Sequence, residues 1–277
     1  MRLFLLTSLT MVAFAANSVL NRLALADGAM QAGTFGVLRL VSGAIVLGLL
    51  VLWQRRRFAF GGLSRWAAVG ALLAYIFGFS LAYAALDPGF GALILFSVVQ
   101  ITMFAGAVLT REAVPVIRWI GALLALGGLV WLLWPIAGTT FSWPHIAAMA
   151  FAGAGWGVYS LLGRGASDPL QATAMNFVLA ALAGLLWIGL TRDVGALPAG
   201  PVLLALVSGG VTSGLGYALW YHILPPLGAT RAAVAQLTVP VIALAGGWAF
   251  LGEEITLRFA LASALVMGGV LLSLRQR

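Results

Sequence analysis

Few side chains in this sequence could do chemistry, and the acidic ones lie at the ends of apolar runs or between them. The acidic residues are Asp27, Asp87, Glu112, Asp168, Asp193, Glu253 and Glu254. A hydrolytic or metal-dependent enzyme requires clustered carboxylates, or a nucleophile paired with a histidine. The two histidines, His145 and His222, are far apart, and there is no cysteine to act as nucleophile or thiolate ligand. The sequence therefore predicts no enzyme, no metal site and no cofactor.

Polar side chains near the middle of the apolar runs are better candidates, because a polar group that faces lipid is costly. The amides are Asn17, Gln100 and Gln236, and the hydroxyls are Thr102, Ser213 and Thr238. Gln100 and Gln236 occupy the same place in two similar halves of the chain, so we expect them to meet near the middle of the membrane. They would either bind a substrate or join two helices by a hydrogen bond, and the sequence leaves both interpretations open.

Arg39 is the deepest charged residue on its side of the membrane, ~9 Å along a helix from the start of its apolar run. Its side chain would either extend to the interface or bind the carboxylate of a substrate. Proton-coupled carriers usually keep an ionisable carboxylate or histidine at membrane depth. Because no acidic residue lies in the middle of an apolar run, the sequence predicts a facilitator without proton coupling.

Aromatic residues recur at helical spacing within several apolar runs. Tyr75 and Phe79 are four positions apart, Trp156 and Tyr159 are three apart, and Tyr217 lies deep in another run. Core packing would explain any one of them, but together they favour a cavity for an amphipathic substrate with an apolar or aromatic side chain. The predicted substrate-binding residues are Asn17, Tyr75, Phe79, Gln100, Trp156, Tyr159, Tyr217 and Gln236.

Membrane-spanning helices must position these residues. Hydrophobic residues make up 62% of the 277 residues and charged residues 8%, and the mean hydropathy is +1.08, which no ordinary soluble domain reaches. A helix needs ~20 apolar residues to cross a bilayer. The candidate spans are 3–21, 33–53, 66–86, 90–109, 116–134, 145–163, 170–190, 201–224, 228–250 and 256–274. We therefore expect an all-α integral membrane protein with ten transmembrane helices.

The chain also repeats itself, with an offset of 136 to 141 residues. The matching pairs are Tyr83 and Tyr221, Pro88 and Pro226, Gln100 and Gln236, Thr102 and Thr238, Glu112 and Glu253, and Gly127 and Gly268. A copy that follows five spans must be inverted in the membrane, and inverted repeats are common in secondary transporters. The predicted five-helix repeats are residues 1–138 and 139–277, which together form one transport domain.

The arginines predict the orientation, since basic residues are enriched on the cytoplasmic side. With the N-terminus in the cytoplasm, the far side would receive only Arg22, Arg39, Arg192 and Arg258. Both termini are therefore expected in the cytoplasm. The first apolar run, with Ala13-Phe14-Ala15, also resembles a cleavable signal peptide, but the second half keeps the matching helix and favours an uncleaved first span. The sequence contains no stripe of basic residues of the kind that binds nucleic acid.

Three stretches of the sequence carry a resemblance to a known family. They are Leu38-Arg39-Leu40, Tyr83 to Ala92, and Leu237-Thr238-Val239-Pro240 with Gly247-Trp248, Gly252-Glu253 and Gly268-Gly269 behind it. On these residues the whole chain resembles the drug/metabolite transporter superfamily, specifically its EamA-type ten-helix carriers. The first half departs from the pattern, because Phe104 stands where proline is expected and Arg111 where glycine is expected.

The resemblance implies an inverted five-plus-five helix fold, a central cavity and export of small metabolites. Among the branches, the chain looks closest to the YddG-type aromatic amino-acid exporters of the bacterial inner membrane. Small four-helix members of the superfamily use a glutamate in their first helix, whereas the first span here offers only Asn17. Proton antiport by that route is not expected.

We therefore expect an inner-membrane secondary transporter that exports amino acids, with aromatic or apolar ones preferred, by alternating access. The amides would bind the ammonium and carboxylate of the substrate, and the rings would bind its side chain. The alternatives are a carrier of the same fold for other metabolites, drugs or nucleosides, and a channel or lipid scramblase. The expected partners are a small molecule and the lipid bilayer, and the expected oligomeric state is a monomer.

Overall fold

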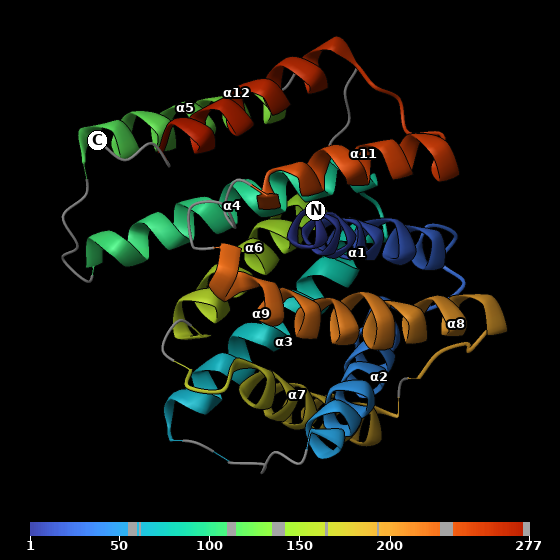
Figure 1. Ribbon diagram of the computed structural model, residues 1–277. Coiled ribbons are helices and arrows are strands. Elements are labelled where there is room, and N and C mark those ends of the chain that lie inside the picture. Colours follow the sequence, from blue (N-terminus) through green and yellow to red (C-terminus); the bar gives the residue numbers. More distant parts are fainter. Residues whose placement is uncertain are drawn as a thin grey trace.

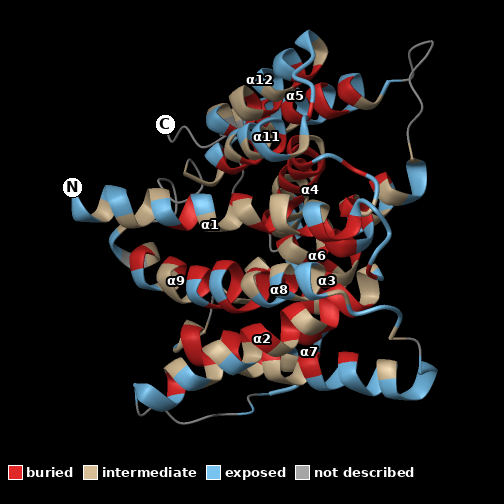
Figure 2. Cartoon of the chain, turned by 90° about the vertical axis from the view of Figure 1, so that its right-hand side faces the viewer, coloured by how far each residue is buried: buried red, intermediate tan, exposed pale blue. Residues whose placement is uncertain are grey.

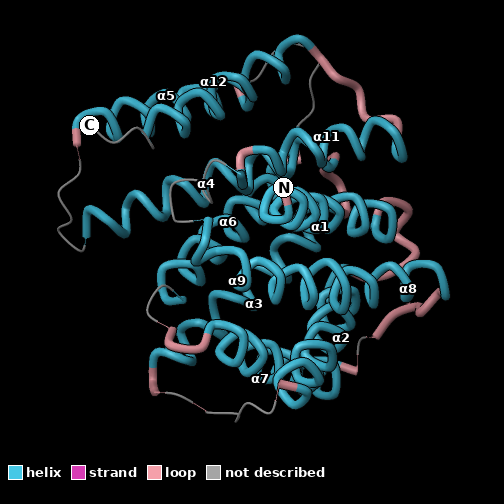
Figure 3. The backbone as a smooth tube through the Cα atoms, in the orientation of Figure 1, coloured by secondary structure: helices cyan, strands magenta, loops and turns pink. Residues whose placement is uncertain are grey.

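In the computed structural model, every regular element of the described part of the chain is a helix, and loops and turns connect the helices (Figures 1 and 3). It describes residues 1–54, 60, 62–109, 115–134, 142–163, 166–192, 194–227 and 235–273. The helices are α1 (Arg2–Leu25), α2 (Ala32–Trp53), α3 (Ser64–Tyr83), α4 (Pro88–Leu109), α5 (Val116–Leu133), α6 (Trp143–Gly163), α7 (Pro169–Thr191), α8 (Ala199–Val207), η1 (Ser208–Leu215), α9 (Gly216–Leu227), α11 (Thr238–Leu251) and α12 (Leu257–Ser273).

Seven of these helices are long and apolar enough to cross a membrane, with α8, η1 and most of α9 counted as one span, Ala199–Leu224. Three further apolar helices are shorter, namely Trp119–Leu133, Thr238–Leu251 and Leu257–Leu272. Together they correspond to the ten predicted spans. The predicted span 228–250 differs most, because α11 begins only at Thr238 and residues 228–234 lie outside the described part.

The outer surface is covered by large apolar side chains. Leu49, Leu186 and Phe250 are exposed by 61%, 64% and 73%. An apolar surface of this kind is costly in water and is stable against lipid tails. The prediction of an all-α, multi-pass membrane protein with ten membrane helices is therefore confirmed.

The helices are stacked in rows across the bundle (Figure 1). α5 and α12 lie side by side at one edge, α4 lies beside α11, and α2 packs against α7 at the opposite edge. α6 packs against α3 and α4, and in the same way α1 packs against α8–η1–α9 and α11. The predicted repeats pair α1 with α6, α2 with α7, α3 with α8–η1–α9, α4 with α11 and α5 with α12. Exchanging the two members of every pair turns this set of contacts into itself. Buried residues are concentrated where the rows meet (Figure 2).

Glycines let α6 approach both of its neighbours closely. A Cβ at Gly155 would lie 2.8 Å from the carbonyl oxygen of Ala71 and 2.9 Å from the amide nitrogen of Tyr75, both on α3. A Cβ at Gly153 would lie 2.8 Å from the carbonyl oxygen of Leu95 on α4. Small residues at such contacts allow helix backbones to come together in a membrane. This packing brings the aromatic residues of α3 and α6 next to each other.

The span built from α8, η1 and α9 is not a uniform α-helix, because η1 is a π-helix of 8 residues. A Cβ at Gly209 in η1 would lie 2.1 Å from the carbonyl oxygen of Arg39 on α2. Such close backbone contact is possible only with glycine. π-Helical turns are rare and are frequent at functional sites. The sequence predicted this span but not its change of helix type.

Candidate substrate-binding cavity

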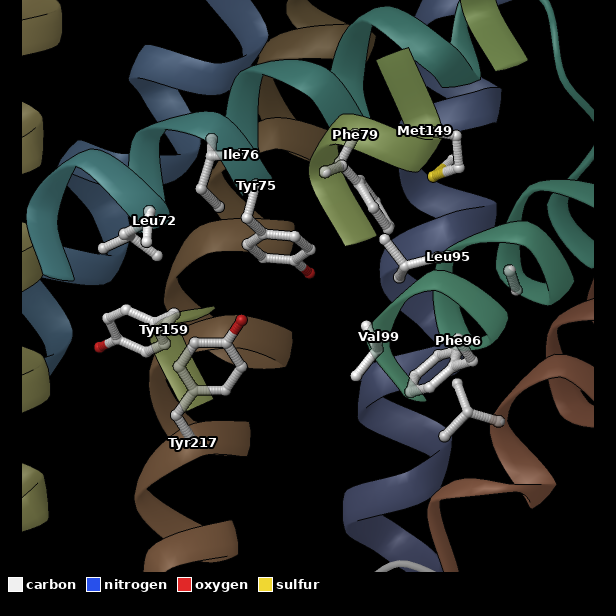
Figure 4. Close-up of a cluster of buried hydrophobic side chains, with 14 of the residues drawn as sticks. Leu72, Tyr75, Ile76, Phe79, Leu95, Phe96, Val99, Met149, Tyr159 and Tyr217 are labelled. Carbon is white, nitrogen blue, oxygen red and sulfur yellow. The ribbon is translucent and has the colours of Figure 1, made fainter. Parts of the chain in front are cut away.

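Six of the eight predicted binding residues surround a small cavity of ≈ 20 Å³ between α1, α3, α4, α6 and α9. Its lining residues are Phe14, Asn17, Ser18, Tyr75, Phe79, Leu95, Phe96, Trp156, Tyr217 and Gln236. Figure 4 shows the side chains of Tyr75, Phe79 and Tyr217 directed toward this space. A cavity of this volume has room for one water molecule. A substrate would therefore have to move the surrounding helices apart in order to bind.

Trp156 is the centre of the aromatic lining. The centre of its indole ring lies 4.9 Å from that of Tyr75, 5.2 Å from that of Tyr217 and 5.7 Å from that of Tyr159. The Tyr159 ring is stacked on the indole, with an interplanar angle of 26°. These distances are typical of attractive aromatic pairs. The helical spacing in the sequence thus predicted a cluster that the structure assembles from three helices.

Tyr159 lies on the other side of Trp156 and lines a second cavity, of ≈ 270 Å³. This cavity is lined by Gly62, Ser64, Arg65, Ala68, Tyr159, Leu162, Gly163, Ala166, Pro169, Ala172, Thr173, Asn176 and Tyr221. We call this end of the bundle the Arg65 end. The stacked pair of Trp156 and Tyr159 separates the two cavities. The sequence did not predict the second cavity, although Arg65 at the start of a span was a signal for a polar site.

A chain of hydrogen bonds holds Tyr159 in place at the Arg65 end. Arg65 Nη1 donates to the side-chain oxygen of Asn176 at 2.9 Å and to the carbonyl oxygen of Ala172 at 2.8 Å. Asn176 Nδ2 in turn donates to the Tyr159 hydroxyl at 3.1 Å. Asn176 is buried, and its amide therefore needs these partners. The ring that separates the cavities is thus anchored to α3 through α7.

The two glutamines have different surroundings. Gln236 lines the central cavity, just before the first residue of α11. Gln100 is half-buried on α4 and is not among the residues that line either cavity. Its predicted contact with substrate stays a prediction.

Arg39 is completely buried, at 0% exposure, in the interior next to the central cavity. Its Nε donates to the Ser213 hydroxyl at 3.1 Å, and its Nη2 donates to the Tyr75 hydroxyl at 3.0 Å. The guanidinium carbon lies 5.0 Å from the centre of the Phe79 ring, within the range of a cation–π contact. Extension to the membrane interface, one of the two interpretations from the sequence, is therefore wrong.

Asn17 joins α1 to the π-helix. Its side-chain oxygen accepts hydrogen bonds from Ser208 at 2.8 Å, Thr212 at 2.6 Å and Ser213 at 3.4 Å. The sequence singled out Asn17 and Ser213 but missed Ser208, Thr212 and Asn21, which donates from Nδ2 to the carbonyl oxygen of Asn17 at 2.8 Å. The spacing of Asn17 and Asn21, one helical turn apart, was a signal that could have found the second amide.

The opposite end of the bundle, which we call the Glu253 end, is held together by charged side chains at helix ends. Arg22 Nη1 donates to the carbonyl oxygen of Ala84 at 2.8 Å, just past the end of α3. Arg258 on α12 donates to the carbonyl oxygens of Trp131 and Trp134 at the end of α5. Cations at the C-terminal ends of helices are stabilised by the unpaired carbonyl groups there.

Glu253 makes the corresponding contact at the start of a helix. Its carboxylate accepts the backbone N–H groups of Gly89 at 2.9 Å and Phe90 at 3.2 Å, both in the first turn of α4. Burial raises the pKa of Glu253 from the ordinary 4.5 to about 7, against the lowering effect of these two N–H donors. Glu253 belongs to the connection between α11 and α12, outside the membrane-spanning helices.

The comparison with family models decides the identity of this helical bundle. Residues 143–275, the second half of the chain, match the EamA-like transporter family. The chain belongs to the EamA-like transporter family. Members of this family are membrane transporters, so the protein is a multi-pass membrane protein that transports a small substrate. The resemblance to EamA-type carriers is confirmed, whereas the narrower likeness to YddG-type exporters stays a prediction.

Similar proteins cover more of the chain than the family model does. An uncharacterized protein of Pseudomonas aeruginosa is 45% identical over 280 residues, which are 100% of this chain and 96% of that protein. An uncharacterized transporter of Archaeoglobus fulgidus is 25% identical over 240 residues, covering 84% of this chain and 83% of the relative. A crystal structure of a protein with 21% identity shares the fold, with a TM-score of 0.67 over 96% of this chain and 98% of the other.

Proposed function

We propose that this EamA-like transporter exports amino acids, with aromatic or apolar side chains preferred, across the bacterial inner membrane. The observation that carries the proposal is the central cavity, where the rings of Tyr75, Phe79, Trp156 and Tyr217 meet the amides of Asn17 and Gln236. Aromatic walls with a few polar groups suit a substrate that has one apolar and one polar end. The resemblance to YddG-type aromatic amino-acid exporters agrees with this lining.

Transport would proceed by alternating access between two inverted halves. The matching helix contacts of the two halves support the inverted repeat. The larger cavity lies at the Arg65 end, whereas Arg22, Glu253 and Arg258 join helices at the other end. The state described here would therefore receive substrate from the Arg65 end, which faces the cytoplasm if both termini are cytoplasmic. The Trp156 and Tyr159 rings would be the inner gate.

The described acidic residues support transport without proton coupling. Asp27, Asp87 and Glu254 are exposed. Asp168 accepts the N–H of Gln171 as the N-cap of α7, and Glu253 caps α4. Neither lies in the central cavity, where a coupled proton would have to be bound from both sides. Glu112 and Asp193 lie outside the described residues.

Uptake of labelled tryptophan, threonine and methionine into proteoliposomes, with and without a pH gradient, tests the proposal. We expect saturable flux of tryptophan above threonine, no accumulation of substrate driven by the gradient, and acceleration by unlabelled substrate on the opposite side. Flux without saturation or counter-substrate stimulation would indicate a channel. Accumulation driven by the gradient would contradict the absence of proton coupling.

A matched pair of tryptophan variants tests the cavity itself. Trp156→Ala removes the central ring, and we expect it to lower tryptophan flux by ~10-fold, since an aromatic pair and its buried area are lost. Trp248→Ala on α11 changes a side chain that is 64% exposed on the outer surface and should leave the flux unchanged. Equal flux in both variants would remove the central cavity from the pathway.

A further inference from the structure

The guanidinium of Arg39 has one nitrogen without a hydrogen-bond partner among the described residues. Its Nε and Nη2 are hydrogen-bonded to Ser213 and Tyr75, but Nη1 is buried and makes no hydrogen bond to any described residue. Buried polar atoms of native proteins are nearly always paired, so an unpaired one calls for an explanation. An arginine side chain stays charged in a protein and can donate but never accept. The missing partner must therefore be an acceptor.

The charge of Arg39 is also unbalanced. Within the described part of the chain no acidic side chain forms an ion pair with it, and the ion pair of Arg22 with Asp87 lies at the Glu253 end. A buried charge is stable when an opposite charge and further hydrogen bonds compensate for its loss of hydration. The hydroxyls of Ser213 and Tyr75 and the Phe79 ring compensate for part of this loss only. The site therefore favours an anion.

The surroundings of Arg39 connect it to the central cavity. Tyr75, which accepts its hydrogen bond, and Phe79, which lies under the guanidinium, both line that cavity. Ser213 donates a hydrogen bond to Asn17, another lining residue. The Tyr75 and Phe79 side chains therefore contact the guanidinium and also line the cavity. A shift of these rings as the cavity widens would expose Nη1 to the substrate.

We infer that Arg39 is the receptor for a carboxylate of the transported molecule. The substrate class is then small zwitterions or monoanions with an apolar body, and organic cations of the same shape are excluded. Nη1, which has no partner among the described residues, and Nη2, which also donates to Tyr75, would donate to the two carboxylate oxygens. This is the bidentate geometry that arginine favours. This inference rests on the proposed central binding cavity, and it adds which charge the substrate must carry.

Three ligands of one shape test the charge requirement in the wild-type protein. Tryptophan carries both a carboxylate and an ammonium, indole-3-propionate only the carboxylate, and tryptamine only the ammonium. Each is titrated separately into the full-length protein in detergent by isothermal titration calorimetry. We expect tryptophan and indole-3-propionate to bind, and tryptamine to bind about 10- to 100-fold more weakly, the factor for a hydrogen bond to a charged group.

Two variants assign the effect to Arg39. Arg39→Met should lose the preference for carboxylate ligands, and Arg39→Lys, which keeps the charge but not the fork of donors, should keep part of it. The control is Arg2→Met, which removes an exposed arginine from the first turn of α1 and should change nothing. A purely structural Arg39, which only joins α2 to α3 and η1, would affect the affinities of all three ligands equally.

The outcomes separate this inference from the proposed function. Tryptamine binding as tightly as tryptophan would overturn the carboxylate receptor and leave the amino-acid cavity standing. Binding of indole-3-propionate without tryptophan would support the receptor and overturn amino-acid export. Binding of neither carboxylate would overturn both. Because these outcomes depend on the wild-type protein, they hold even if an Arg39 variant fails to fold.

Discussion

The carboxylate of Glu253 accepts the backbone N–H of Gly89 at 2.9 Å, although the two residues are 164 positions apart in the chain. The N–H of Phe90 reaches the other carboxylate oxygen at 3.2 Å. The first amides of a helix have no partners within it, so a side chain from the second half of the chain caps a helix of the first half. This contact joins the two halves at the Glu253 end.

We predict that low pH keeps the Glu253 end closed. The pKa of Glu253 is raised by burial to about 7, and a carboxyl that becomes hydrated on opening would return toward 4.5. The closed state therefore holds its proton more tightly. The extra stability that this proton gives the closed state over the open state is fully present below pH 4.5 and is lost as the pH rises through 7. The neighbouring charges act in opposite directions, since Asp87 raises the pKa of Glu253 and Arg22 lowers it.

Spin labels at Ala85→Cys and Ile255→Cys would measure this opening, and the absence of native cysteines makes the labelling specific. Both positions are exposed at the Glu253 end. We expect the population at long distance to increase between pH 4.5 and 7 in the wild-type background. Glu253→Gln cannot titrate and should show no pH dependence. The same dependence in both proteins would assign the titration to another group.

We further predict that Gly247→Ala breaks the cap on α4. A Cβ at Gly247 would lie 2.0 Å from a carboxylate oxygen of Glu253, so this side chain would have to leave its place. Loss of a helix cap costs about 0.5–2 kcal/mol. Gly268→Ala on α12 is the matched control, because nothing lies within 4 Å of its new Cβ and alanine favours a helix. Thermal unfolding in detergent should give a lower Tm for Gly247→Ala only.

Much of the fold could be predicted from the sequence because each element has a local signal. Ten apolar runs predicted the spans, and helical spacing singled out Tyr75, Phe79 and Trp156, which line the central cavity, and Tyr159, which lines the cavity at the Arg65 end. The exposed ends were marked by turn and charged residues. These signals are the apolar composition and the helical period of a membrane helix, and both can be read within a single segment of the sequence.

The contacts between distant segments could not be predicted, because they depend on how the helices rotate and approach one another. The position of Arg39 along its span could be read from the sequence, but its hydrogen bond to Ser213, which is 174 positions away, depends on the π-helix. No residue type marks a π-turn in the way that proline marks a kink. The cavity at the Arg65 end likewise depends on Asn176, which had no periodic signal in the sequence.

Asn17→Ala should destabilise the protein. Its side-chain oxygen is the shared acceptor for Ser208 and Thr212 in η1, and hydrogen bonds between membrane helices contribute about 0.6 kcal/mol each on average. We expect a loss of about 1–2 kcal/mol in unfolding free energy, measured by denaturation in mixed detergent. The control is Thr7→Ala on the same helix, since the Thr7 hydroxyl bonds only to Leu3 of its own helix. An equal loss in both variants would contradict the shared-acceptor role.

Tyr217→Phe should affect transport without affecting stability. The Tyr217 hydroxyl is buried, makes no hydrogen bond to the described residues and points toward the central space (Figure 4). Removing an unpaired buried hydroxyl is neutral or stabilising, whereas a hydrogen bond to substrate contributes about 0.5–1.5 kcal/mol. We therefore expect an unchanged or higher Tm and a KM for tryptophan raised about 2- to 10-fold.

Tyr83→Phe is the matched control, since the Tyr83 hydroxyl donates to the carbonyl oxygen of Pro88 at 3.2 Å and lines neither cavity. It should lower Tm and leave KM unchanged, because its partner belongs to the protein and not to the substrate. The opposite pattern, with Tyr217→Phe losing stability at constant KM, would mean that the Tyr217 hydroxyl serves the packing of α9 and that the substrate is recognised by Arg39 and the rings alone.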